Sequence, residues 1–116
     1  EKLTLKNDIK QFDLNKESLQ LQFENAGTSV ISSYSSYQTN KDNMALAKKV
    51  ADVTNYQYQQ GEASLTDYLN DDAAYKISQD NYLISVYNLL ISQLNYQKSK
   101  GSLFAYINQI KEKNGE

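Results

Sequence analysis

The chain has no cysteine, histidine, tryptophan or proline, and only four of its 116 residues are glycine. Without cysteine no disulfide can form, and without cysteine and histidine a zinc site of the usual kind is excluded. The same absences exclude Ser-His-Asp and Cys-His catalysis. We therefore expect no enzymatic activity, no cofactor and no bound metal. A chain with so few turn-forming residues is typical of long helices.

Charge and hydropathy exclude further classes of protein. The 12 basic and 14 acidic residues give a net charge of -2, which does not favour a nucleic-acid partner. The most apolar stretch, YLISVYNLLISQL (residues 82–94), is interrupted by serine, asparagine and glutamine, so it predicts a buried helix rather than a membrane span. Because the chain begins at Glu1 and shows no leader, we interpret it as an excised segment or as the mature C-terminal part of a longer protein.

The first half of the chain carries one uninterrupted periodic pattern, in which steps of three and four residues alternate. Such a pattern predicts a helix over about residues 2–59 with a coiled-coil seam. Small and polar residues interrupt the seam, so the partner helix is expected to approach closely. The seam runs through Ile9, Phe12, Lys16, Leu19, Phe23, Ala26, Val30, Ser33, Tyr37, Asn40, Met44, Ala47, Ala51, Thr54 and Tyr58.

A break at residues 60–65 separates this helix from a second one, predicted over about residues 66–100. Gly61 is expected to end the first helix, and Ser64 and Asp67 have the spacing of a capping-box variant. The main stripe of the second helix is predicted to be Leu69, Ala73, Ile77, Asp80, Ile84, Tyr87, Ile91 and Leu94. A second row indicates neighbours on two sides; it comprises Tyr68, Tyr75, Tyr82, Leu83, Val86 and Leu90.

A further stop is predicted at the C-terminal end of the second helix. Lys98 and Lys100 suit the negative end of a helix, and Gly101 suits the residue after it. A short third helix is then expected over about residues 102–111. The predicted fold class is all-α, a long antiparallel coiled-coil hairpin with a short C-terminal helix. In that arrangement residues 3–23 would have no partner within the chain.

The turn and the second helix resemble one family. The pattern Tyr58-x-x-Gly61-x-x-Ser64-x-x-Asp67-x-Leu69, the return helix through residues 81–94, and the final Lys-Gly-Ser-Leu of residues 100–103 together resemble TolC-like outer-membrane efflux proteins. The resemblance implies the second repeat of a protomer in a homotrimer, with this segment forming part of a periplasmic α-barrel. It implies a passive conduit for efflux or type I secretion, located at the outer membrane of a Gram-negative bacterium.

The same resemblance implies which residues matter. Asp67 would contribute to a ring of carboxylates at the pore mouth. A second acidic position of the family is Asn70 here, and Asp71 follows it. Asp67 is equally explained from sequence as a charge that favours the start of a helix. A periplasmic adaptor hairpin, working with an inner-membrane pump, would dock at the tip through Tyr58, Gly61, Glu62, Ala63, Ser64 and Leu69.

Two other classes of protein remain as alternatives. A periplasmic adaptor hairpin, or another helical docking protein, would also explain the heptads and the tip. Asp71, Asp72 and Asp80 could suggest a di-metal helical bundle, but no histidine completes the pattern that such sites use.

Overall fold

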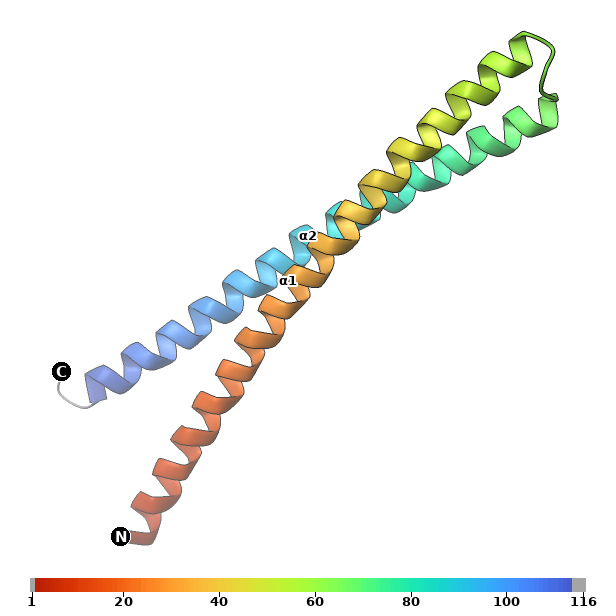
Figure 1. Ribbon diagram of the computed structural model, residues 1–116. Coiled ribbons are helices and arrows are strands. Elements are labelled where there is room, and N and C mark those ends of the chain that lie inside the picture. The colour runs from red at the N-terminus through yellow and green to blue at the C-terminus, as the bar shows by residue number, and fades with distance from the viewer. Residues whose placement is uncertain (1, 114–116) are drawn as a thin grey trace. The chain divides into compact units, whose positions relative to one another are not determined.

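A computed structural model describes residues 2–113, and all of its regular structure is helical. Helix α1 spans Lys2–Gln59 and helix α2 spans Leu65–Lys113, and a short turn joins them (Figure 1). The prediction of an all-α chain built on two long helices is therefore confirmed. Within the described residues, neither helix is long and apolar enough to cross a membrane.

The described chain divides into two compact units, and each contains part of both helices. We call residues 2–31 with 91–113 the terminal unit, and residues 32–90 the turn unit. In the terminal unit Phe12 packs against Tyr106 and Phe23 against Tyr96, with ring centroids 5.9 and 5.0 Å apart. Because residue numbers rise on α1 as they fall on α2, the helices are antiparallel in this unit.

The predicted seam of α1 corresponds closely to the side that packs against α2. From Phe12 to Thr54, each predicted seam position except Lys16 is buried or half-buried. Ala51 and Thr54 are the most deeply buried residues of α1. The small side chains in this seam leave room for the two backbones to approach closely.

The predicted main stripe of α2 is wrong, because a different row faces α1. That row includes Tyr68, Tyr75 and Tyr82 of the predicted second row, but Leu83 and Leu90 of the predicted second row are exposed. Ile84 is 58% exposed, whereas its neighbour Ser85 is only 3% exposed. The observed seam alternates bulky residues with small ones at heptad spacing. Its bulky positions are Tyr68, Tyr75, Tyr82, Leu89, Tyr96, Leu103 and Ile110, and its small positions are Ser78, Ser85, Ser92 and Ser99.

The serines of α2 explain why this less apolar row can be buried. Ser78 donates a hydrogen bond to the carbonyl of Tyr75, and Ser85 donates one to the carbonyl of Tyr82, both at 2.6 Å. Each hydroxyl is thus satisfied by its own helix and needs no partner on α1. A small, satisfied side chain allows α1 to approach closely while the tyrosines fill the layers between the serines.

The predicted third helix is also wrong, because α2 continues through Gly101 to Lys113. Among the described glycines only Gly61 has a positive φ, so Gly101 does not adopt the left-handed conformation of a helix end. A glycine inside a helix costs only about 1 kcal/mol relative to alanine. Packing beyond it favours the helix, since Tyr106 packs on Phe12 and donates a hydrogen bond of 2.8 Å to its carbonyl.

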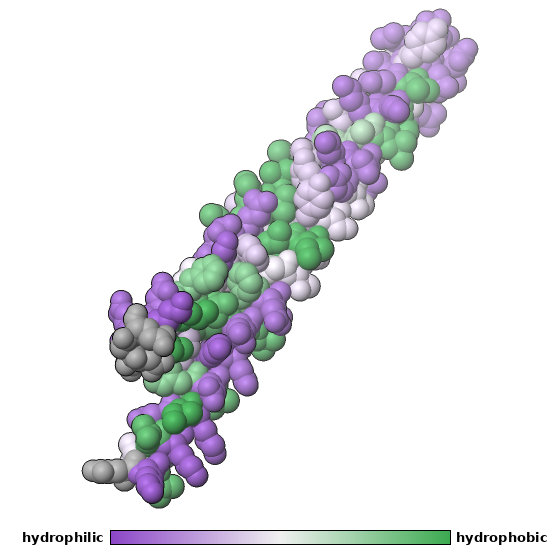
Figure 2. All heavy atoms as spheres, turned by 60° about the vertical axis from the view of Figure 1, so that its left-hand side comes forward, coloured by the Kyte–Doolittle hydropathy of each residue, from purple (hydrophilic) through white to green (hydrophobic). Residues whose placement is uncertain are grey.

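This longer α2 corrects a further expectation about the start of the chain. Phe12 and Phe23 lie in the stretch predicted to lack a partner, yet both contact tyrosines of α2. Leu3, Leu14 and Leu21 remain exposed on α1. Figure 2 shows that apolar side chains, in green, reach the molecular surface rather than being confined to an interior.

Candidate functional site

The turn between the helices has a defined geometry that depends on Gly61. Gly61 has φ of 79°, and its N–H donates to the carbonyl of Tyr58 at 3.0 Å. The next N–H, of Glu62, donates to the carbonyl of Gln57 at 2.7 Å. These two bonds form a Schellman motif, which satisfies the last carbonyls of α1. A left-handed residue is required there, and glycine adopts that conformation without steric cost.

The start of α2 is capped as its sequence predicted. The Ser64 hydroxyl accepts a hydrogen bond of 3.0 Å from the N–H of Asp67, and the Ser64 carbonyl accepts one of 3.1 Å from Tyr68. Ser64 is therefore the N-cap, and Asp67 lies in the first turn of α2. Its exposed carboxylate lies near the positive end of the helix dipole.

Two tyrosines connect the helices beside the turn. Tyr58 on α1 and Tyr68 on α2 stack with ring centroids 5.7 Å apart and planes 19° apart. Tyr58 is still 40% exposed, so part of its ring faces solvent. This pair holds the ends of the helices together and offers an aromatic surface to an approaching partner.

One helical turn further along, a polar bond crosses between the helices. Thr54 donates a hydrogen bond of 2.6 Å to the carboxylate of Asp71. The Thr54 hydroxyl also lies 2.9 Å from the carbonyl of Val50, on its own helix. Thr54 is buried and Asp71 half-buried, so this charge-assisted bond stabilises the pairing of the helices near the turn.

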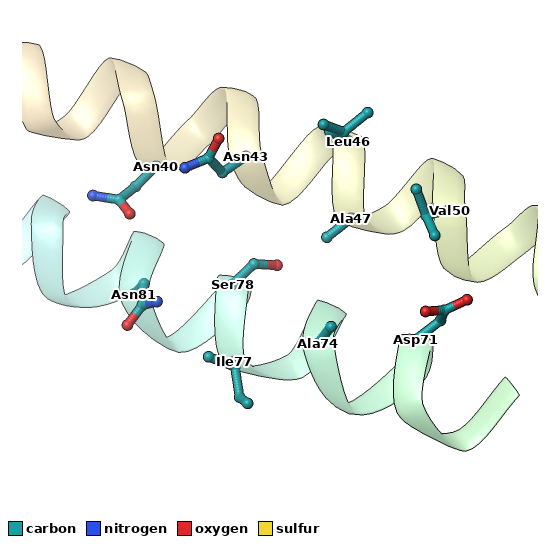
Figure 3. A pocket seen from close by; sticks show the side chains of 10 residues that line it. All are labelled: Asn40, Asn43, Leu46, Ala47, Val50, Asp71, Ala74, Ile77, Ser78 and Asn81. Atoms are coloured by element: carbon teal, nitrogen blue, oxygen red, sulfur yellow. The ribbon is translucent and has the colours of Figure 1, made fainter. Parts of the chain in front are cut away.

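A groove of about 440 Å³ follows this bond along the side of the turn unit (Figure 3). Ala47 and Val50 of α1 and Ala74 of α2 form part of its apolar lining, while Leu46 and Ile77 point away from the gap at its edges. Amide, hydroxyl and carboxylate groups complete the lining and come from Asn40, Asn43, Asp71, Ser78 and Asn81. Small apolar residues flanked by polar ones make a shallow groove that suits another protein surface better than a small ligand.

The turn unit is acidic around the turn. Between Lys49 and Lys76 the chain has five carboxylates and no basic residue. Most of these carboxylates are exposed, so their summed field extends into solvent and favours a basic partner. The five residues are Asp52, Glu62, Asp67, Asp71 and Asp72.

The structure brings most of the predicted site residues together at one place. Ala63 is half-buried in the turn, and Asp67, Leu69 and Asn70 are exposed on the first turns of α2. Asp71 differs from them because its carboxylate is bonded to Thr54. The predicted tip residues, all close to this turn, are Tyr58, Gly61, Glu62, Ala63, Ser64 and Leu69.

Sequence reasoning placed Thr54 in the seam of α1 and Tyr68 near the tip, but it did not predict the bond of Thr54 to Asp71, the stacking of Tyr68 on Tyr58 or the groove. Tyr68 had a detectable signal, since it begins the row of tyrosines seven residues apart on α2. Thr54 had none, because a hydroxyl in a coiled-coil seam does not indicate its acceptor. Within the described residues no group of histidine, cysteine or acidic side chains could hold a metal ion.

Comparison with models of protein families, with curated proteins and with solved structures finds no match for this chain.

Proposed function

We propose that this chain is a helical segment of the periplasmic tunnel of an outer-membrane efflux or type I secretion channel. In this proposal the segment acts as a passive conduit wall in a homotrimer. Its turn docks to the hairpin tip of a periplasmic adaptor, which connects it indirectly to an inner-membrane pump. The chemistry of transport then belongs to the pump, and this segment supplies a surface.

The observation that carries the proposal is the unpartnered apolar row of α2. Two long helices that pack on each other through one seam leave the remaining faces to solvent, and those faces are normally polar. Here the more apolar row of α2 is the exposed one. A helix with apolar rows on two sides suits a wall in which every helix has two neighbours. The exposed positions of that row include Leu69, Ile77, Ile84, Tyr87, Ile91 and Leu94.

The turn supports the docking part of the proposal. Gly61 and Ala63 present little side-chain bulk, so another helical tip could approach the backbone closely. The Tyr58 and Tyr68 pair adds an aromatic edge beside them. Contacts of this kind are small and individually weak, and a ring of identical copies would strengthen them by multivalency.

A second candidate function is a hairpin of a periplasmic adaptor or another helical docking protein. It is favoured by the continuity of α2, which runs from Leu65 to Lys113 without the break expected at Gly101. A plain two-helix hairpin with an acidic tip fits that role. The exposed apolar row of α2, which includes Leu69, Ile77 and Ile84, is the feature that favours the tunnel wall instead.

A pair of tests in the full-length protein separates the two functions. Gly61→Glu or Ala63→Glu should abolish efflux while assembly at the outer membrane is retained. The matched control is Ala45→Glu, which adds the same charge at an exposed position of α1. Normal efflux in the tip variants would remove the docking part of the proposal.

Cross-linking tests the wall itself. Single cysteines at Ile84 or Tyr87, both exposed, should cross-link to other copies of the same protein in intact cells. Cysteines at Ala63 or Ser64 should instead cross-link to an adaptor. If the α2 cysteines cross-link only to a different protein and the protein is found as a monomer or adaptor-like assembly, the second candidate is correct.

A further inference from the structure

Helix α2 carries a second heptad row on a side that α1 does not cover. Its residues are spaced alternately four and three apart, as in a coiled-coil seam, and every one of them is exposed. Because the row that packs on α1 has the same period, this second row keeps a constant position relative to that contact. We call it the outward row. It consists of Ala73, Ile77, Asp80, Ile84, Tyr87, Ile91, Leu94, Lys98, Gly101 and Ala105.

The outward row has two halves, one in each unit, and their spacings are mirror images about Leu89. When two copies of α2 run in opposite directions, the half in the turn unit of one copy lies opposite the half in the terminal unit of the other. Two of the opposed pairs are large and apolar, and a third places an isoleucine opposite a glycine that has open space around it. The five pairs are Ala73 with Ala105, Ile77 with Gly101, Asp80 with Lys98, Ile84 with Leu94, and Tyr87 with Ile91.

Charge favours this direction and this register. Asp80 and Lys98 are the only charged residues of the outward row, and in the antiparallel pairing each lies opposite the other. In a parallel pairing Asp80 would face Asp80 of the second copy, and the lysines would face each other, which opposes association. A shift of one heptad in either direction leaves both charges opposite uncharged residues. The row thus disfavours the alternative pairings as well as favouring one.

The residues that flank the outward row fit the same pairing. Leu83 and Leu90 are 63% and 54% exposed on one side of it, and Leu90 lies opposite Leu90 of the second copy. On the other side Asn88 lies opposite Asn88, so an amide meets an amide that offers both a donor and an acceptor. Lys76 is the only charged residue among these flanking positions, and it faces the aromatic ring of Phe104 rather than another lysine.

We propose that two copies of this chain pair through the outward row of α2, with the two helices antiparallel. Each contact joins the turn unit of one copy to the terminal unit of the other, and it occurs twice because the two copies exchange the same surfaces. Only half of the row is large and apolar, so the dissociation constant should be modest, about 100 µM. At about 5 µM the chain is then mostly monomeric.

A second copy fits the outward row better than a strongly charged partner does. The row contains one charge of each sign, so neither a basic nor an acidic surface satisfies both. The proposal does not rest on the proposed tunnel function, in which a neighbouring helix of the wall would cover this row. It is measured on the chain alone, so its failure would leave the efflux tests unchanged, and theirs would leave it unchanged.

Charge reversal tests the register. The 116-residue chain is studied by sedimentation equilibrium from about 5 to about 500 µM. Asp80→Lys and Lys98→Asp are prepared separately, and circular dichroism verifies that both remain helical. Each reversal introduces two repulsive pairs into the dimer and should weaken it at least about tenfold. The matched control is Asp42→Lys at an exposed position of α1, which should weaken it less than about threefold.

Mixing the two reversed chains gives the sharper result. In a mixed pair the two lysines of one chain lie opposite the two aspartates of the other, so the mixture should dimerise although neither chain does so alone at the same concentration. The chain that carries both reversals should also dimerise like the unmodified one. An unmodified chain that stays monomeric up to about 500 µM would overturn the proposal. So would a mixture that associates no better than its two components.

Disulfide formation tests the direction, and a chain without cysteine makes that test clean. A chain with Ile84→Cys, mixed with one that carries Leu94→Cys, should form a mixed disulfide, because these positions are opposed in the antiparallel pairing. Ile84→Cys alone should form little disulfide, since residues 84 of the two copies are then displaced along the helices by about 15 Å. Preferential disulfide formation between two copies of the Ile84→Cys chain would indicate parallel helices and overturn the proposal.

Discussion

Thr54 and Asp71 join the two helices through a hydrogen bond of 2.6 Å, placed between the aromatic pair at the turn and the groove beside it. Thr54 is buried and Asp71 half-buried, so the carboxylate depends on this donor for part of its solvation. Asp71 was expected from the resemblance to contribute to a pore mouth. In the structure its first role is to hold α1 and α2 together.

Removing that donor is expected to destabilise the hairpin. Thr54→Val keeps the shape of the side chain but leaves the half-buried carboxylate without its partner, so the free energy of unfolding should fall by about 1.5 to 3 kcal/mol. The control is Thr39→Val at an exposed position of α1, which should change stability by less than about 0.5 kcal/mol. Urea unfolding followed by circular dichroism measures both. Equal stability of the two variants would show that the bond contributes nothing net.

Two glycine substitutions should have opposite effects. Gly61 has a positive φ, so Gly61→Ala should destabilise the chain by about 1 kcal/mol although no atom lies within 4 Å of the added methyl group. Gly101 is inside α2 with open space around it, so Gly101→Ala should stabilise the chain by up to about 1 kcal/mol. Thermal unfolding of both variants tests this. If the Gly101→Ala variant were instead less stable than the unmodified chain, the helix end predicted at Gly101 would be supported.

How much the sequence predicts differs between the helices for a physical reason. In α1 one periodic row dominates, and it is the row that packs. In α2 two rows compete, and hydropathy favours the one with Leu69, Ile77 and Ile84. The buried row instead alternates tyrosine and serine. Because α1 has small side chains along its seam, the two helices can pack closely, and serine is small enough for α2 at those positions. A hydropathy scale ranks each row by the free energy of transferring its side chains out of water. Burial between these helices depends instead on the size of the side chains and on serine hydroxyls that already have a hydrogen-bond acceptor.

The turn was predictable, and the end of α2 was not. At the turn, Gly61 and Ser64 act locally through backbone conformation and capping, so short sequence patterns are enough. At Gly101 the same kind of local signal is present, but contacts of Tyr106 with Phe12 favour a continuous helix. A contact between residues 94 positions apart in the sequence cannot be read from a local stop signal.

Adjacent substitutions on α2 test which row faces α1. Ser85→Leu places a large side chain in the close contact between the helices and should cost about 1 to 3 kcal/mol. Ile84→Gln alters a residue that is mostly exposed and should change stability by less than about 0.5 kcal/mol. Urea unfolding of the isolated chain gives both values. If Ile84→Gln were the more damaging change, the row predicted from hydropathy would be the buried one after all.

The contact between Tyr37 and Tyr82 in the turn unit predicts that the folded chain loses stability at alkaline pH. The hydrogen bond with Tyr37 is the main cause that raises the pKa of Tyr82 above its ordinary value of 10.0, and desolvation raises it further. Since the unfolded chain releases this proton at lower pH, the neutral phenol stabilises the folded chain below pH 10.0, and this contribution is lost as pH rises through the higher folded-state pKa. Tyr37→Phe removes the hydrogen bond but keeps the ring contact at 5.6 Å.

Tyrosinate absorbance during an alkaline titration measures this effect. In the Tyr37→Phe variant the absorbance change assigned to Tyr82 should move to lower pH, and the alkaline loss of stability should become smaller. Subtracting the titration of a Tyr82→Phe variant makes the assignment. An unchanged titration of Tyr82 in the Tyr37→Phe variant would contradict the hydrogen bond as the cause.

The proposed role of Asp67 at a pore mouth can be tested in the full-length protein. Its carboxylate is exposed, so three copies around a narrow aperture would concentrate cations there. Asp67→Ala should therefore weaken block by multivalent cations in single-channel recordings. It should barely alter folding, because an exposed charge at a helix start contributes only about 0.3 to 1 kcal/mol. Asp42→Ala removes an exposed carboxylate from the middle of α1 and serves as the control. If both variants show the block of the unmodified channel, Asp67 only favours the start of α2, and the ring of carboxylates does not exist.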